Sequence, residues 1–252
     1  MNVVEYGKMN EQVIVLLHGG GLSWWNYREV AEQLQNDYHV VLPILDGHAG
    51  SKHNFTSIEN NASELIEYID KHMNGSVLLL GGVSLGGQIV VEALAQRSDI
   101  CQFAVIESAL VLPMKLTHSL VKPMLDSSFW LIKKKWFARL QFKSLKIKDE
   151  LYEEYYRDTC RITKENMISF LKANSDYQIK KTLENTQAHV LIVAGEKEQN
   201  IMLKSAQTLN KMIPESCMEI KKDLYHGEYS LNDAKEYVDR IRKFIKKKET
   251  QK

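Results

Sequence analysis

The feature that most constrains this chain is the pentapeptide Gly82-Val83-Ser84-Leu85-Gly86, which directly follows an apolar run at residues 77–80. The run predicts a buried strand, and residues 87–94 predict a helix. The chain must then reverse sharply at Ser84, and the flanking glycines leave room for the turn. In this strand–turn–helix context the G-x-S-x-G pattern predicts a nucleophile elbow, which exposes a strained serine at a helix N-terminus.

Short apolar runs alternate with helical patterns along most of the chain. The runs are continuously apolar, which is typical of strands covered on both faces. We therefore predict a doubly wound α/β sheet, mostly parallel, with right-handed crossovers. The predicted strands are residues 13–17, 40–45, 77–80, 103–106, 190–193 and 217–220, and the predicted helices are 25–35, 58–72, 87–96, 202–212 and 233–246.

One long stretch breaks this alternation, because no strand pattern follows residue 106 until residue 190. Such a stretch is too long for a loop within a compact domain. It predicts several helices, with breaks at Pro113, Pro123 and the Asp126-Ser127-Ser128 cluster. We interpret residues 111–186 as an inserted helical cap, and residues 1–110 and 187–252 as one core domain.

A serine hydroxyl is a weak nucleophile, so it needs a base that is oriented by an acid. The predicted base is His226, whose loop follows the last predicted strand and can present an imidazole to Ser84. The preferred acid is Glu198, which follows a strand and a turn at Gly195. Glu107 ends a neighbouring strand and stays open as the alternative acid.

A glycine run, Gly19-Gly20-Gly21, follows the first strong strand. Small residues there let backbone amides face a developing oxyanion, so we predict an oxyanion hole formed by the amides of Gly20 and Leu85. A dinucleotide-binding loop is excluded, because the run lacks the G-x-G-x-x-G spacing.

Three polar residues in the neighbouring loops could be mistaken for catalytic groups. His18 precedes the glycine run, and Asp46 and His48 lie in a turn-rich loop after the second strong strand. We expect all three to stabilise these loops through hydrogen bonds.

Together these segments resemble an α/β-hydrolase of the single-domain serine type with a helical cap. The resemblance implies the chain order nucleophile, acid, base, which Ser84, Glu198 and His226 follow. It also implies that the first one or two of the family's eight strands are shortened here. The family's usual acid is aspartate. Because position 198 holds glutamate instead, Glu107 stays open as the alternative acid. The matching segments are residues 18–21, 46–51, 82–86, 195–198 and 226–227.

The predicted cap begins with an unusual composition. Residues 111–148 hold eight lysines and one arginine against a single acid, with five interleaved aromatic residues. Our preferred interpretation is a solvated helix face whose aromatics pack onto the core; the alternative is a surface that attracts an anionic substrate or a membrane interface. We predict a substrate pocket lined by Gly21, Trp24, Trp25 and Trp130.

The composition excludes several classes of protein. A formal net charge of +1 gives no general field for nucleic acid. The three cysteines are widely spaced and suggest neither a metal site nor a disulfide framework. The N-terminus lacks the apolar segment of a signal peptide. We expect a cytoplasmic protein without a metal or cofactor.

These residues predict a carboxylesterase-like serine hydrolase that acts through an acyl-serine on a small, partly apolar ester, thioester or lactone. A lyase or a cofactor-free peroxidase could use the same three residues, because one fold hosts many reactions. A ligand-binding protein that kept the fold without catalysis is the third hypothesis; labelling of Ser84 by a fluorophosphonate distinguishes it.

Overall fold

The computed structural model of the protein describes residues 1–249, in which seven strands form one sheet. The strand order is β1-β3-β2-β4-β5-β6-β7, and only β1 runs antiparallel to its neighbour. The strands are β1 (Asn2–Tyr6), β2 (Val13–Leu17), β3 (His39–Ile44), β4 (Val77–Val83), β5 (Cys101–Glu107), β6 (His189–Gly195) and β7 (Ser216–Lys221). All six predicted strands are present, which confirms the mostly parallel sheet.

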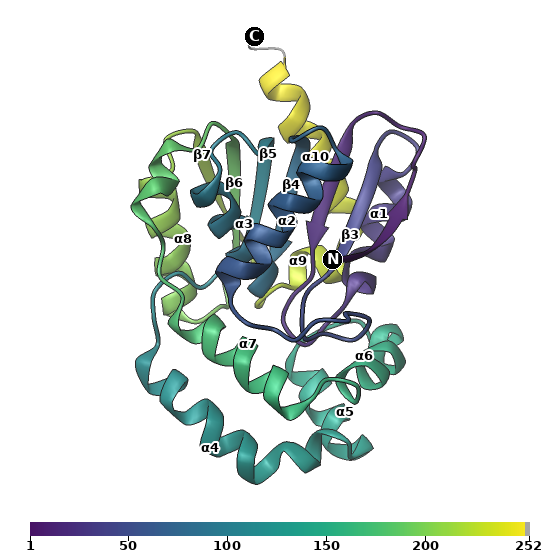
Figure 1. Ribbon diagram of the computed structural model, residues 1–252, viewed down its shortest axis with the longest axis vertical. Helices are drawn as coiled ribbons and strands as arrows, with labels where there is room; N and C mark the ends of the chain where they lie inside the picture. The colour runs from purple at the N-terminus through teal and green to yellow at the C-terminus, as the bar shows by residue number, and fades with distance from the viewer. Residues whose placement is uncertain (250–252) are drawn as a thin grey trace.

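Helices cover both faces of this sheet, as Figure 1 shows. The predicted core helices are present, with ends that differ slightly from the prediction. They are α1 (Arg28–Leu34), which continues from the 3₁₀ helix η1 (Trp24–Tyr27), α2 (Ile58–His72), α3 (Leu85–Gln96), α8 (Asn200–Met212) and α10 (Ala234–Glu249). A short helix that the sequence did not suggest, α9 (Glu228–Asn232), precedes α10.

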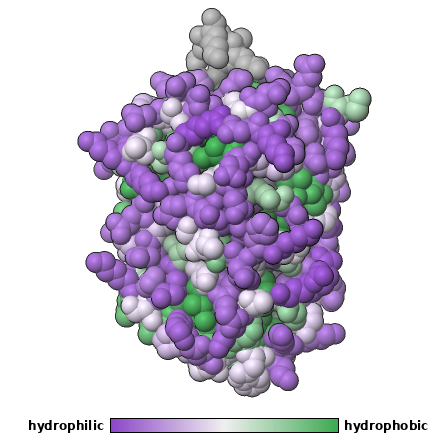
Figure 2. All heavy atoms as spheres, in the orientation of Figure 1, coloured by the Kyte–Doolittle hydropathy of each residue, from purple (hydrophilic) through white to green (hydrophobic). Residues whose placement is uncertain are grey.

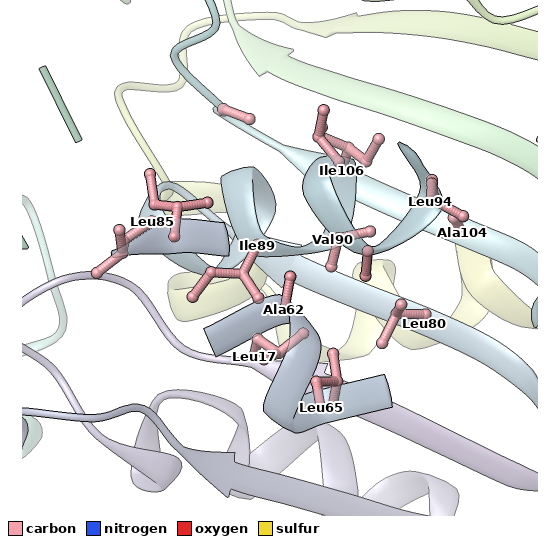
Figure 3. Close-up of a cluster of buried hydrophobic side chains, with 14 of the residues drawn as sticks. Leu17, Ala62, Leu65, Leu80, Leu85, Ile89, Val90, Leu94, Ala104 and Ile106 are labelled. Atoms are coloured by element: carbon pink, nitrogen blue, oxygen red, sulfur yellow. The ribbon is translucent and has the colours of Figure 1, made fainter. Parts of the chain in front are cut away.

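Strand residues alternate between two cores. Leu17, Leu80 and Ala104 point to the side of α2 and α3, where Figure 3 shows them packed with Leu65 and Ile89. Their immediate neighbours along the strands pack against α1 and α10 on the opposite side. Because both of their faces are buried, the central strands β2 and β4 have no polar side chain at any position.

Four helices lie between β5 and β6 and gather at one end of the sheet in Figure 1. We call them the inserted helices: α4 (Lys115–Ile132), α5 (Lys135–Ser144), α6 (Tyr152–Thr159) and α7 (Lys164–Asp176). Two 3₁₀ helices, η2 (Asp149–Leu151) and η3 (Lys181–Asn185), accompany them. Within residues 1–249, no helix is both long enough and apolar enough to cross a bilayer.

The predicted helix breaks at Pro123 and at residues 126–128 are wrong, because α4 runs through both. Pro123 is exposed, so water can reach the carbonyl that its missing N–H leaves free. Two serine hydroxyls of residues 126–128 donate to carbonyls one turn earlier instead of ending the helix. The buried face formed by Val121 and Leu125 holds α4 together by tertiary packing.

Candidate active site

Ser84 stands in a strained turn between β4 and α3. Its φ of 54° and ψ of −116° are sparsely populated for a residue with a side chain. Its amide donates to the carbonyl of Glu107 over 2.9 Å. A Cβ at Gly82 would lie 2.5 Å from Gly86, and one at Gly86 would lie 2.2 Å from the Leu17 carbonyl oxygen. The turn therefore requires glycine at both positions.

His226 lies in the loop between β7 and α9, opposite this turn. Its Nε2 lies 2.9 Å from the Ser84 hydroxyl, and 46% of its side chain is exposed. The loop turns at Gly227, which has a φ of 67° and donates its amide to the Ser108 hydroxyl over 3.1 Å. The imidazole thus meets Ser84 from an open site that a small molecule can reach.

Glu198 contacts the other side of the imidazole. One of its carboxylate oxygens lies 2.8 Å from Nδ1 of His226, and its side chain is fully buried. Because an ionised carboxylate only accepts hydrogen bonds, Nδ1 carries the proton and Nε2 is free to accept from Ser84. The structure therefore brings Ser84, His226 and Glu198 together in one hydrogen-bonded chain.

Hydrogen bonds hold the Glu198 carboxylate in its charged form. Burial acts to raise its pKa, but bonds from His226, from the Gly195 amide and from the Ser108 hydroxyl outweigh burial, so the pKa lies below its usual value. The Gly195 amide and the Ser108 hydroxyl each lie 2.7 Å from the same carboxylate oxygen. The oxygen that faces His226 is thus left for the imidazole.

Ser108 is a site residue that the sequence analysis missed. It bridges Glu198 and the amide of Gly227, and so joins the loops that carry the carboxylate and the imidazole. Its φ of 53° places it in the left-handed region, where its backbone is strained. The available signal was its position directly after β5, at the edge where parallel strands end.

Glu107, the alternative acid, occupies a different place. Its side chain is buried and accepts from the Ser230 amide of α9 over 3.2 Å, while its second carboxylate oxygen has no partner within residues 1–249. Burial raises the pKa of Glu107 to about 7, and the nearby Glu198 acts in the same direction. This carboxyl supports α9, and the backbone carbonyl of Glu107 accepts from the Ser84 amide, but the side chain does not hydrogen-bond to His226.

The two predicted oxyanion donors lie beside each other. A Cβ at Gly20 would lie 3.5 Å from the Leu85 side chain, so the glycine loop passes close to the start of α3. The amides of Gly19 and Gly21 donate to Asn26 and His48 over 3.1 and 3.0 Å. Within the described residues the Gly20 amide has no partner, and Leu85 begins a helix, where the first amides are unpaired.

Two buried histidines fix this loop. His18 donates from Nδ1 to the Gly19 carbonyl and accepts at Nε2 from the Leu45 amide. His48 likewise lies 2.9 Å from the Asp46 carbonyl and accepts from Gly21. Burial lowers the pKa of His18 to about 3 and that of His48 to about 4. Both are therefore neutral near pH 7 and shape the glycine loop.

A cavity of about 150 Å³ opens onto Ser84 and His226. Its other lining residues are small or apolar: Gly19, Gly20, Leu22, Val83, Leu145, Ile147, Gly227 and Leu231. None of the predicted pocket residues Gly21, Trp24, Trp25 and Trp130 lines it, and the cavity corrects that expectation.

The tryptophans have other contacts. Trp25 is buried and donates from its indole N–H to Asp158 of α6 over 2.8 Å, so it anchors the inserted helices. Trp24 is half-buried under the guanidinium of Arg28. Trp130 faces outward from α4 and is 60% exposed. Leu145 and Ile147 line the cavity where we had expected tryptophan side chains.

One group of side chains away from the cavity has metal-ligand chemistry. Asp46, His53 and Glu64 each offer one ligand atom, and these atoms lie within 4.8 Å of one another. His53 is exposed, and Asp46 already accepts a hydrogen bond from Ser51. We assign no metal to this group.

A serine, histidine and carboxylate chain at the carboxyl edge of a doubly wound sheet defines the class: the protein is an α/β-hydrolase. The chain belongs to the family described as serine aminopeptidase, S33, whose family model matches residues 8–230.

Several known proteins resemble this chain in sequence or in fold. Lipase 1 of Psychrobacter immobilis is 23% identical over 90% of this chain and 74% of its own. An esterase from Exiguobacterium antarcticum superposes with a TM-score of 0.81 at 18% identity, covering 97% of this chain and 94% of that one. A bromoperoxidase from Bacillus anthracis gives 0.78 at 18% identity with the same coverage. At these identities the solved structures show a shared fold.

Replacing Glu198 by Gln should lower kcat far more than replacing Glu107 by Gln. A neutral amide at position 198 stabilises no imidazolium and can favour the wrong tautomer of His226, so we expect a loss of roughly 10³–10⁴-fold. Glu107→Gln should lose less than about tenfold, because its side chain does not contact the imidazole. Ester hydrolysis by both folded variants measures the difference; the opposite ranking would assign the acid to Glu107.

Glu107 should also make stability depend on pH. Because its folded pKa of about 7 lies above its ordinary value, its contribution is complete below about pH 4.5 and is lost as the pH rises through 7. Between pH 5 and pH 8, Glu107→Gln should therefore gain roughly 2–3 kcal/mol of unfolding free energy relative to the unmodified protein. Urea unfolding at both pH values measures this, with the exposed Glu11→Gln as the control. A constant difference would contradict the elevated pKa.

Proposed function

We propose that the protein is a serine hydrolase that cleaves carboxylic esters with short, apolar acyl groups through an acyl-serine intermediate. The observation that carries the proposal is the hydrogen-bonded chain from Ser84 through His226 to Glu198, which opens onto an apolar cavity. The likeness to a lipase and to esterases supports the same class of reaction.

In the proposed reaction, Ser84 Oγ attacks the ester carbonyl carbon while His226 Nε2 takes the hydroxyl proton. Glu198 stabilises the imidazolium that forms. His226 then returns the proton to the leaving alkoxide oxygen, and the carbon–oxygen bond breaks to leave an acyl-serine. Water repeats the sequence, with His226 again as the base, and releases the acid.

The proposed oxyanion hole consists of the amides of Gly20 and Leu85. Both lie next to Ser84 and neither is used within the described residues. His18 and His48 hold the glycine loop in place as neutral acceptors and donors, so the Gly20 amide needs no rearrangement when charge develops. A fixed donor of this kind typically lowers the barrier by about 2.7–4 kcal/mol.

The cavity limits the acyl group. At about 150 Å³ it is smaller than the roughly 300–1,000 Å³ of a typical small-molecule pocket. Apart from Ser84 and the imidazole of His226, its lining offers an acyl chain no polar side chain. Acetyl to butyryl groups fit such a space, whereas long fatty acyl chains exceed it.

We further propose that residues 111–186 act as a cap that selects the acyl group. Leu145 and Ile147, which follow α5, line the cavity together with Ser84 and His226. Ile147 packs in one apolar cluster with Leu22 and Leu231 of the core domain. The cap thus contributes directly to substrate volume.

A p-nitrophenyl ester series of increasing acyl length should show hydrolysis with an optimum at four carbons or fewer. Ser84→Ala should reduce kcat by roughly 10³-fold or more, since it removes the nucleophile while leaving the fold intact. The measurement is kcat/KM across the series for both proteins, with circular dichroism as the control for folding.

Labelling by a fluorophosphonate separates the remaining hypotheses. Stoichiometric labelling that disappears in Ser84→Ala supports an acyl-serine. A folded protein whose serine stays unlabelled and that hydrolyses no ester would contradict the proposal and favour a ligand-binding role.

Ile147→Ala should shift the chain-length optimum to longer acyl groups. Removing its side chain extends the cavity, and one methylene in an apolar site changes kcat/KM by about 10-fold or more. The ratio of hexanoate to butyrate hydrolysis should rise by at least that factor. Ile168→Ala, on α7 and outside the cavity, is the matched control. An unchanged ratio would mean that Ile147 does not bound the acyl site.

A further inference from the structure

The outward faces of α4 and α5 expose large apolar side chains. Figure 2 shows hydrophobic side chains reaching the surface among hydrophilic ones over the lower part of the molecule, where Figure 1 places these helices. Between 53% and 75% of each side chain is exposed in Leu116, Leu120, Met124, Trp130, Trp136 and Leu140. We call this set with its neighbouring lysines the α4–α5 surface. Single exposed apolar residues are common, but a group of six on two adjacent helices indicates a binding surface.

The segment that contains these two helices is strongly basic. Residues 111–148 hold eight lysines and one arginine against Asp126 alone, whereas the whole chain has a net charge of only +1. Asp126 is itself paired with Lys122 and Lys164. Its charge is therefore already neutralised within the surface.

Several of these lysines are unpaired. Lys115, Lys133, Lys134 and Lys143 are exposed and have no ion pair within the described residues. Lys133 and Lys134 form the junction between α4 and α5, between the exposed Trp130 and Trp136. Lysines thus lie between two exposed tryptophans where α4 and α5 meet.

We propose that the α4–α5 surface docks onto an anionic membrane. Apolar side chains and indoles enter the boundary between headgroups and acyl chains, while lysines reach the lipid phosphates from the same face. Each lysine near an anionic bilayer adds a favourable interaction that salt screens. Docking of this kind lays the helices on the bilayer and does not depend on the proposed hydrolysis.

Charge excludes a second copy as the natural occupant. Two α4–α5 surfaces brought face to face would place both sets of unpaired lysines in contact, and like charges oppose such pairing. A nucleic acid would match the charge but would leave Leu116, Leu120 and Met124 without an apolar partner. An anionic bilayer satisfies both components.

The surface also borders the candidate active site. Leu145 follows α5, lines the cavity and is 39% exposed. The ammonium of Lys146 lies 5.3 Å from the ring centre of Tyr225, the residue before His226. A docked molecule would therefore hold the cavity mouth close to the bilayer, where apolar esters concentrate.

Co-sedimentation with vesicles tests the proposal directly. The protein should bind vesicles of phosphatidylcholine with phosphatidylglycerol, bind those of phosphatidylcholine alone much more weakly, and lose the difference at high salt. Lys133→Glu with Lys134→Glu should weaken binding by roughly thirtyfold or more. Lys211→Glu with Lys243→Glu makes the same charge change at exposed positions of α8 and α10, outside the α4–α5 surface, and should have little effect.

A second variant tests the apolar component. Leu120→Ser with Trp136→Ser should also lose binding to anionic vesicles, although it keeps every lysine. Circular dichroism and thermal unfolding of each variant exclude loss of the fold as the cause.

The proposal fails if the unmodified protein does not bind anionic vesicles, or if the Lys211 and Lys243 control loses as much as the Lys133 and Lys134 variant. If the protein does not bind vesicles but forms a dimer, and Leu120→Ser with Trp136→Ser dissociates that dimer, the surface would be assigned to a second copy. If the protein does not bind vesicles but binds duplex or single-stranded DNA in a salt-dependent way, the surface would be assigned to nucleic acid.

Discussion

The close approach of two backbone segments at Gly82 and Gly86 is the constraint on which the rest of the site depends. Only with both glycines can β4 pass directly into α3 and leave Ser84 at a φ of 54°. The strained turn is held by a hydrogen bond from the Ser84 amide to the carbonyl at the end of β5. The next residue, Ser108, donates to Glu198 and accepts from the loop of His226. Hydrogen bonds between the residues that follow neighbouring strands therefore hold these loops in place, and with them the distance between Ser84 and the imidazole of His226.

Two buried carboxyls on adjacent strands show how the surroundings separate their roles. Glu198 receives hydrogen bonds from Gly195, Ser108 and His226 and keeps a low pKa despite burial. Glu107 receives one bond from Ser230, and its pKa rises to about 7. A charge beside the imidazole is useful for catalysis, whereas a second charge so near would raise the cost of the first. The protein thus supplies one ionised carboxylate and one that is largely neutral in mildly acidic solution.

The sequence predicted those parts that depend on local pattern. Continuous apolar runs identified six strands, and the glycines around Ser84 identified the turn, because both follow from nearest-neighbour sterics and burial. The choice between Glu198 and Glu107 stayed open because each lies near the end of a strand. The contacts that distinguish them join Glu198 to Ser108 and to His226, 90 and 28 residues away in the chain. The cavity lining was missed for a similar reason. Trp25 donates a hydrogen bond to Asp158, 133 residues away in the chain, and no local sequence pattern predicts such a contact.

The inserted helices and the glycine loop are mechanically linked. Trp25 and Arg28 bind Asp158 and Glu154 of α6, and they lie only a few residues after the Gly20 amide. Leu22, within the same loop, packs with Ile147. Any shift of α6 relative to the sheet would therefore act on the glycine loop as well as on the cavity. The fold does not by itself choose a substrate. In this chain the residues that line the cavity are tied to the glycine loop that we propose as the oxyanion hole. If both proposals hold, substrate selection and rate would change together.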